Sequence, residues 1–78
     1  MLTHLRGNYE GVPLSPREAE ILQLIIDGEK RTEIADRLVI SKKTVDGHLW
    51  RVRAKLAART NIHAAAIHVR RTLTPSRG

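Results

Sequence analysis

The residues best suited to bind an anion stand together at Ser41-Lys42-Lys43-Thr44, near the middle of the chain. Serine often caps the start of a helix, where the first backbone N–H groups have no partner inside the helix. Two lysines directly after the cap add positive side chains to these N–H donors, and helix starts favour anions. The pattern predicts an anion site, and the phosphate backbone of a nucleic acid is the obvious occupant.

A helix over about residues 42–57 is predicted to position these groups. At about 100° per residue its apolar side chains fall on one side, which is therefore suited to pack against a core. This apolar stripe consists of Val45, Leu49, Val52 and Leu56. The opposite side holds Lys43, Gly47, Trp50 and Ala54, with Arg51 beside them. We expect the second side to be free to meet a partner.

Two further helices are predicted before this one. Ser15-Pro16-Arg17-Glu18 has the form of a capping box with proline at the first helical position, and the helix should end at Asp27-Gly28. A short helix is expected over about residues 32–38, with a poorly capped start because Lys30 and Arg31 stand where a capping residue is expected; Thr32 can cap it only if the helix starts later. Only a sharp turn fits between this short helix and the next one.

A fourth helix is predicted from a Thr60 cap to about Arg71. Its expected apolar side consists of Ile62, Ala65, Ala66 and Val69. No stretch alternates with a period of two for long enough to predict a strand. The expected fold class is an all-α, four-helix, bundle-like domain over residues 13–73, with a flexible segment at 1–12 and a flexible tail at 74–78.

The charge of the chain is strongly uneven. The 78 residues carry a formal net charge of +6. Residues 1–29 contain two basic and five acidic groups, a net −3, whereas residues 30–78 contain twelve basic and three acidic groups, a net +9. Such an asymmetry points toward a polyanion as partner, although a basic face can also serve only to keep a small protein soluble.

Several classes of protein do not fit the composition. The chain has no cysteine, so disulfides and thiolate metal sites are excluded. The four histidines include no pair at i, i+4, and no nucleophile-base arrangement is visible, so we expect neither metal nor cofactor, and no enzyme. No apolar run is long enough to span a bilayer, and no signal peptide is visible. A cytoplasmic, nucleoid-associated location is expected.

The ordered motifs closely resemble the DNA-binding domain of LuxR-type (GerE-like) transcription regulators over about residues 14–69. The resemblance is carried by Leu14-Ser15-Pro16-Arg17-Glu18, Ile21-Leu22, Gly28, Glu33-Ile34-Ala35, Leu38, Ile40-Ser41, Thr44-Val45, His48, Lys55-Leu56, Arg59 and Ala64. It implies a LuxR-type tetrahelical fold in which the second and third helices form a helix-turn-helix and the third enters the major groove of duplex DNA. It also implies a transcription regulator that binds two half-sites as a homodimer, with RNA polymerase as a possible further partner.

The resemblance also assigns roles to residues of this chain. Base reading maps onto Asp46, Gly47 and Trp50. The DNA backbone is expected to meet Lys30, Arg31, Ser41, Lys43, Thr44, Arg51, Arg53 and Lys55. The dimer contact of the fourth helix maps onto Ala64, Ile67 and His68.

Each of these roles has a plainer alternative. Asp46 can be an exposed helix residue or a partner of Lys42 or Lys43, and Trp50 can pack against a neighbouring loop. Gly47 can be a tolerated weak helix residue, and each basic residue can be a solvated surface charge. Two other functions also remain open. One is promoter recognition within a larger polymerase assembly, as in the related region of sigma factors. The other is a protein-interaction module that acts on a transcription complex with weak or incidental DNA binding.

Overall fold

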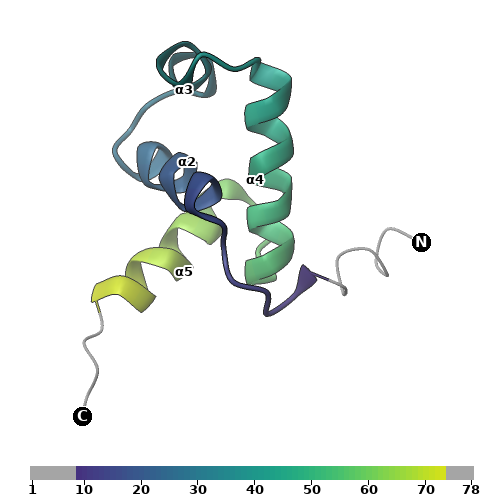
Figure 1. The fold of residues 1–78 in the computed structure, drawn as a ribbon. Coiled ribbons are helices and arrows are strands. Elements are labelled where there is room, and N and C mark those ends of the chain that lie inside the picture. The colour runs from purple at the N-terminus through teal and green to yellow at the C-terminus, as the bar shows by residue number, and fades with distance from the viewer. Residues whose placement is uncertain (1–8, 74–78) are drawn as a thin grey trace.

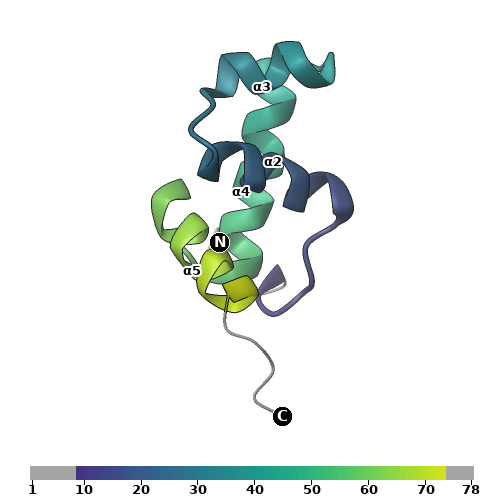
Figure 2. The ribbon, with the colours of Figure 1, turned by 90° about the vertical axis from the view of Figure 1, so that its left-hand side faces the viewer.

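The computed structural model describes residues 9–73 of the chain, and the predicted tail at 74–78 and most of the predicted N-terminal segment lie outside them. The described part contains four helices and no strand, which confirms the all-α fold class. The helices are α2 (Pro16–Ile26), α3 (Arg31–Leu38), α4 (Lys42–Leu56) and α5 (Asn61–Leu73). Helix α4 contacts each of the other three, which lie along its length (Figure 1). A view turned by 90° shows α3 and α5 at opposite ends of α4 (Figure 2).

The capping box predicted for the first of these helices is present in α2. Ser15 Oγ accepts a hydrogen bond from the Glu18 N–H at 3.1 Å, and Glu18 Oε1 accepts one from the Ser15 N–H at 2.9 Å. At the other end, Gly28 adopts a φ of 95°, a left-handed conformation that glycine adopts without a Cβ clash. Both ends of α2 were therefore predictable from local sequence.

Helix α3 begins one residue earlier than predicted, at Arg31, so Thr32 is not its cap. The preceding Lys30 has no side-chain acceptor that could cap the helix. Instead, its backbone N–H donates to Glu33 Oε1 at 2.7 Å, which is the reciprocal half of a capping box. One hydrogen bond, donated by the Lys30 N–H and accepted by the third helical residue, Glu33, thus fixes the start of α3 without a capping serine.

The turn between α3 and α4 contains a β-branched residue in the left-handed region. Val39 ends α3 with φ 57° and ψ 47°, and its side chain is 87% exposed. Ser41 then caps α4, accepting from the Thr44 N–H at 3.0 Å as predicted. The sharp turn brings α3 and α4 together, which completes the helix-turn-helix.

The core consists of two clusters that meet at α2. Adjacent residues of α2, Ile21 and Leu22, are both fully buried but belong to different clusters. The first cluster joins α2, α3 and the first half of α4 through Ile21, Ile34, Ala35, Val45 and Leu49. The second joins α2, the end of α4 and α5 through Leu22, Val52, Leu56, Ala58 and Ala64. The apolar stripe predicted for α4 is thus confirmed, and it is shared between the clusters.

The predicted apolar side of the last helix is partly wrong. Thr60 caps it as expected, because its Oγ1 accepts from the His63 N–H at 2.9 Å. However, Ala64 is fully buried, whereas Ile62 is 82% exposed and Ala66 is also exposed. Alanine occurs all around this helix, so apolar periodicity could not distinguish the side that packs from the side that faces solvent.

A second correction concerns the outer side of α4. Ala54 was predicted to lie on the free side, yet it is only 1% exposed. The stretch at 9–12, predicted to be flexible, runs beside this part of α4, and the Gly11 N–H donates to the Lys55 carbonyl at 3.1 Å. Only the N-terminal half of α4 therefore presents an open outer side.

Candidate nucleic-acid interface

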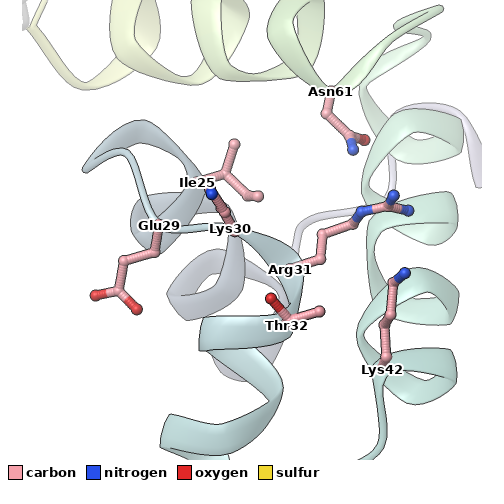
Figure 3. A pocket seen from close by; sticks show the side chains of 7 residues that line it. All are labelled: Ile25, Glu29, Lys30, Arg31, Thr32, Lys42 and Asn61. Carbon is pink, nitrogen blue, oxygen red and sulfur yellow. The ribbon is translucent and has the colours of Figure 1, made fainter.

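Cationic side chains surround the starts of α3 and α4. Lys30, Arg31, Lys42 and Lys43 are all exposed. Three of them help to line a hollow of about 430 Å³, together with Ile25, Glu29, Thr32 and Asn61. Figure 3 shows Arg31 reaching from α3 toward α4, with Lys42 and Asn61 nearby. Positive charge and helix N-termini together make this surface suited to phosphate groups.

The cap of α4 stands at the edge of this surface. Ser41 Oγ lies 2.9 Å from Thr44 Oγ1, and both residues are exposed. Their hydroxyls are therefore held in place by the helix cap and remain accessible to solvent. Lys43 is exposed on the same turn, and Lys42, which the residue assignments from sequence left out, is exposed beside it.

Asp46 forms an ion pair with Arg31. The Arg31 Nη1 donates to Asp46 Oδ1 over 2.9 Å, and the two side chains are 48% and 43% exposed. The alternative partners considered from sequence were Lys42 and Lys43, but the structure selects a residue fifteen positions away on α3. Sequence spacing carried no signal for this contact because it depends on how α3 packs on α4.

Gly47 lies on the open part of α4, and a Cβ built there would have no heavy atom within 4 Å. Its backbone is helical, so neither conformation nor space inside the chain requires glycine. The missing side chain therefore affects only the shape of the outer surface of α4, where it leaves more room for a partner.

Trp50 is half-buried and packs against an aromatic residue of the N-terminal segment. Its ring lies 5.7 Å from the ring of Tyr9, at an interplanar angle of 89°. Such an edge-to-face arrangement is favourable for aromatic pairs. The packing alternative considered for Trp50 therefore describes part of its role, and base reading by its remaining exposed edge stays a prediction.

Two of the predicted phosphate contacts instead bind a buried carboxylate. Lys55 Nζ lies 2.6 Å from Glu18 Oε1, and Arg51 Nε lies 3.3 Å from Glu18 Oε2. The side chain of Lys55 is only 10% exposed, and its Nζ also donates to the Pro13 carbonyl at 3.2 Å. The Lys55 side chain is thus held in the interior by Glu18 and has little exposed surface with which to meet the DNA backbone. The sequence pattern identified Glu18 only as part of a helix cap.

The electrostatics of Glu18 favour its charged form. Burial raises the pKa of the Glu18 carboxyl, but the hydrogen bonds and charge of Lys55, the Ser15 N–H and Arg51 outweigh burial. The net pKa therefore lies below its ordinary value of 4.5. A carboxylate that is buried but fully partnered can lock α2 to the end of α4.

His48 belongs to the same polar cluster. Its Nδ1 lies 3.1 Å from Arg51 Nη2. Burial, followed by the positive charge of Arg51, lowers the pKa of His48 below its ordinary 6.5. His48 is therefore mainly neutral at pH 7 and able to accept a hydrogen bond from Arg51.

The remaining assignments divide between surface and interior. The predicted backbone contact Arg53 is half-buried and donates from Nη1 to Asn61 Oδ1 at the start of α5. Of the predicted dimer residues, Ala64 is fully buried within the chain, so it cannot meet a second copy, whereas Ile67 and His68 are half-buried. The structure thus corrects Ala64 and leaves the other two accessible only in part.

Two negative findings apply to residues 9–73. No group of three or more histidine, aspartate or glutamate side chains there could hold a metal ion. No helix in that range is long and apolar enough to cross a membrane.

Comparison with known proteins places this chain in a family. Residues 12–69 match the model of the luxR family of bacterial regulatory proteins. That range includes the helix-turn-helix, the Glu18 cluster and most of α5.

Individual relatives agree with this match. The chain is 47% identical over 49 residues to the uncharacterized response regulatory protein YgeK of Escherichia coli K12, covering 63% of this chain and 33% of that protein. It is 38% identical over 55 residues to the transcriptional regulatory protein DesR of Bacillus subtilis, covering 70% and 28%. It is 33% identical over 72 residues to the transcriptional activator protein BjaR1 of Bradyrhizobium diazoefficiens, covering 86% and 30%. The matched part thus spans about a third or less of each of these relatives.

Proposed function

Since the chain belongs to the luxR family of bacterial regulatory proteins, we propose that it regulates transcription by binding duplex DNA with its helix-turn-helix. The observation that carries this proposal is the open N-terminal half of α4, which has a hydroxyl cap and exposed cations at its start. A helix with this arrangement fits the major groove and can meet phosphates at its N-terminus. The names of DesR and BjaR1, both described as transcriptional proteins, support the same role.

The proposed roles of individual residues in DNA binding differ from those expected from sequence. Exposed Lys30, Lys42 and Lys43 contact phosphates, with Ser41 and Thr44 beside them. Gly47 and the exposed edge of Trp50 approach the bases. Lys55 holds the fold together and does not contact DNA. The domain extends over residues 13–73, acts in the cytoplasm on the nucleoid, and has no catalytic role.

Fluorescence anisotropy with labelled duplexes tests this function. A random duplex and a duplex selected from a random pool are titrated at low and at physiological salt. We expect tighter binding to the selected duplex, and a steep loss of affinity with salt because phosphate contacts release counterions. Replacement of Lys43 by alanine should weaken binding to both duplexes and reduce the salt slope by about one. No binding at low salt would refute the function and favour a protein-interaction module.

We also propose that the chain occupies two half-sites as a homodimer through α5. One side of this helix carries Ile62, Ala66, Val69 and Leu73, at successive spacings of four, three and four residues. Ile62, Ala66 and Leu73 are exposed, and Val69 is half-buried. Ile62 is 82% and Leu73 is 73% exposed, so an apolar stripe faces solvent. A symmetric contact between two copies would cover this stripe. It replaces the contact predicted around Ala64.

Sedimentation equilibrium, with and without a two-site duplex, tests the dimer. Ile62→Asp should shift the chain toward monomer and reduce cooperative binding to two half-sites, while binding to one half-site persists. The matched control is Thr72→Asp, an exposed α5 position outside the stripe. If both substitutions have the same effect, the stripe is not the dimer contact.

An RNA polymerase contact, also proposed, would use surfaces left free by DNA and by the second copy.

A further inference from the structure

The ion pair between Arg31 and Asp46 occupies the proposed DNA-binding surface. It joins the first residue of α3 to the second turn of α4 over 2.9 Å. The side chains are 48% and 43% exposed, so neither is withdrawn into the core. Lys42, one turn before Asp46 on α4, is exposed next to the pair. Any DNA that meets the start of α4 therefore meets these two groups together.

An unpaired carboxylate at this place would repel phosphate groups. The ion pair with Arg31 neutralises that charge, and it also leaves N–H donors of the guanidinium free. A guanidinium has five N–H donors in a planar fork, and the hydrogen bond to Asp46 Oδ1 uses one of them. The fork can still donate two parallel hydrogen bonds to guanine O6 and N7, which cytosine, thymine and adenine cannot accept in the same way. The donor offered to DNA is thus the arginine.

The structure also restricts where the Arg31 guanidinium can lie. At its base, the helix start is fixed by the hydrogen bond between the Lys30 N–H and Glu33 Oε1, at 2.7 Å. At its tip, Asp46 holds the guanidinium beside α4. An arginine held at both ends loses less rotamer freedom on binding than a free one, and such preorganisation favours affinity and specificity.

On this basis, and resting on the proposed function, we propose that Asp46 is a positioning residue that holds Arg31 to read a guanine edge in the major groove. Asp46 then accepts no hydrogen bond from a base. This assignment differs from direct base reading by the Asp46 carboxylate, which was the role that the family resemblance implied. It makes a cross-helix pair, instead of Asp46 alone, a determinant of sequence preference beside Gly47 and Trp50.

A double-mutant cycle distinguishes the two roles. A duplex is first selected from a random pool with the unmodified chain, and anisotropy then gives the ratio of affinities for the selected and a random duplex. We expect Arg31→Ala and Asp46→Ala each to reduce this ratio about tenfold, the loss of one bidentate base contact. The double variant should lose no more than Arg31→Ala alone, because Asp46 acts through Arg31. A further loss in the double variant would overturn the proposal in favour of direct reading by Asp46.

Conservative variants exclude a role in charge or folding alone. Arg31→Lys keeps the charge but not the fork, so it should lose sequence preference while retaining affinity for random DNA; preserved preference would overturn the proposal. The control Arg17→Ala removes an arginine from an exposed pair with Glu20 on α2 and should leave the ratio unchanged. The melting temperatures of the variants at Arg31 and Asp46 should stay close to that of the unmodified chain, because exposed ion pairs stabilise little.

The outcomes separate this inference from the function on which it rests. If the unmodified chain binds no duplex at low salt, the proposed function itself fails. If it binds DNA without any sequence preference, or with independent effects of positions 31 and 46, DNA binding stands and only the positioning role of Asp46 is lost.

Discussion

Lys55 Nζ lies 2.6 Å from Glu18 Oε1, and this contact joins the first turn of α2 to the last turn of α4. The two side chains are only 10% and 5% exposed. Glu18 also completes the capping box of α2 through its bond to the Ser15 N–H. The Glu18 carboxylate therefore both caps the start of α2 and holds α2 against α4. Its partner Lys55 is a residue that the sequence pattern assigned to the DNA backbone.

Lys55→Ala is expected to lower the free energy of unfolding by about 3 kcal/mol, because it leaves Glu18 buried without its main counter-ion. For a domain of this size such a loss is a large fraction of the total. Urea unfolding followed by circular dichroism measures it. The control Lys43→Ala, at an exposed lysine of the same helix, should change stability by less than about 0.5 kcal/mol. Equal effects of the two substitutions would show that Lys55 is not a structural residue.

Acidification is expected to destabilise the domain in two windows. The pKa of His48 lies below 6.5 in the folded chain, so the unfolded chain takes up this proton first. Stability should therefore begin to fall as pH drops below 6.5. The pKa of Glu18 lies below 4.5 when folded; the stability it contributes is present above 4.5 and is lost as pH falls through the folded pKa.

Urea midpoints measured between about pH 7.5 and pH 3 resolve these windows. His48→Gln should flatten the upper window and leave the lower one, because glutamine does not titrate. A midpoint that stays constant from neutral pH to about 5 in the unmodified chain would contradict the assignment of neutral His48.

Gly47→Ala is expected to have opposite effects on stability and on DNA binding. Alanine favours a helix over glycine by about 1 kcal/mol, and the added Cβ meets no atom of the chain. The melting temperature should rise by several degrees. If the missing side chain allows close approach to the bases, affinity for the selected duplex should fall. Unchanged affinity would make Gly47 a merely tolerated residue. As a control, Gly28→Ala should destabilise the chain, because Gly28 has a φ of 95°.

Val39→Gly is expected to stabilise the helix-turn-helix by up to about 1 kcal/mol, since a β-branched residue is strained in the left-handed region. Val39 is 87% exposed, so little buried contact is lost. Thermal unfolding measures the gain. Val69→Gly, which places glycine inside α5, should have the opposite sign. A loss of stability in both variants would show that the turn is not strained.

Local chemistry accounts for the features that sequence predicted well. The caps at Ser15, Ser41 and Thr60 and the stop at Gly28 involve contacts over at most four residues, which spacing reveals directly. The apolar stripe of α4 was also predictable, because large aliphatic side chains recur there at helical spacing. On its packed side, helix α5 has no such stripe, because small alanines on every side remove the contrast between core and surface.

The roles of charged residues could not be predicted in the same way. Lys43 and Lys55 are lysines on the same helix, yet Lys43 is exposed whereas Lys55 is buried against Glu18. Glu18 and Lys55 are thirty-seven residues apart in the sequence. Asp46 likewise meets Arg31 across two helices. A charge pattern shows the sign of a surface, but the partner of each charge depends on which helices come together.

By itself, the sequence determined the four helices, the helix-turn-helix and the basic character of the region after residue 30, because caps, apolar periodicity and net charge are local or additive properties. Only the tertiary structure decided which cations remain available to DNA, which face of α5 is open and which group accompanies Asp46. Those outcomes depend on the packing of α2, α3 and α5 along α4, and this packing places residues distant in sequence within hydrogen-bond reach.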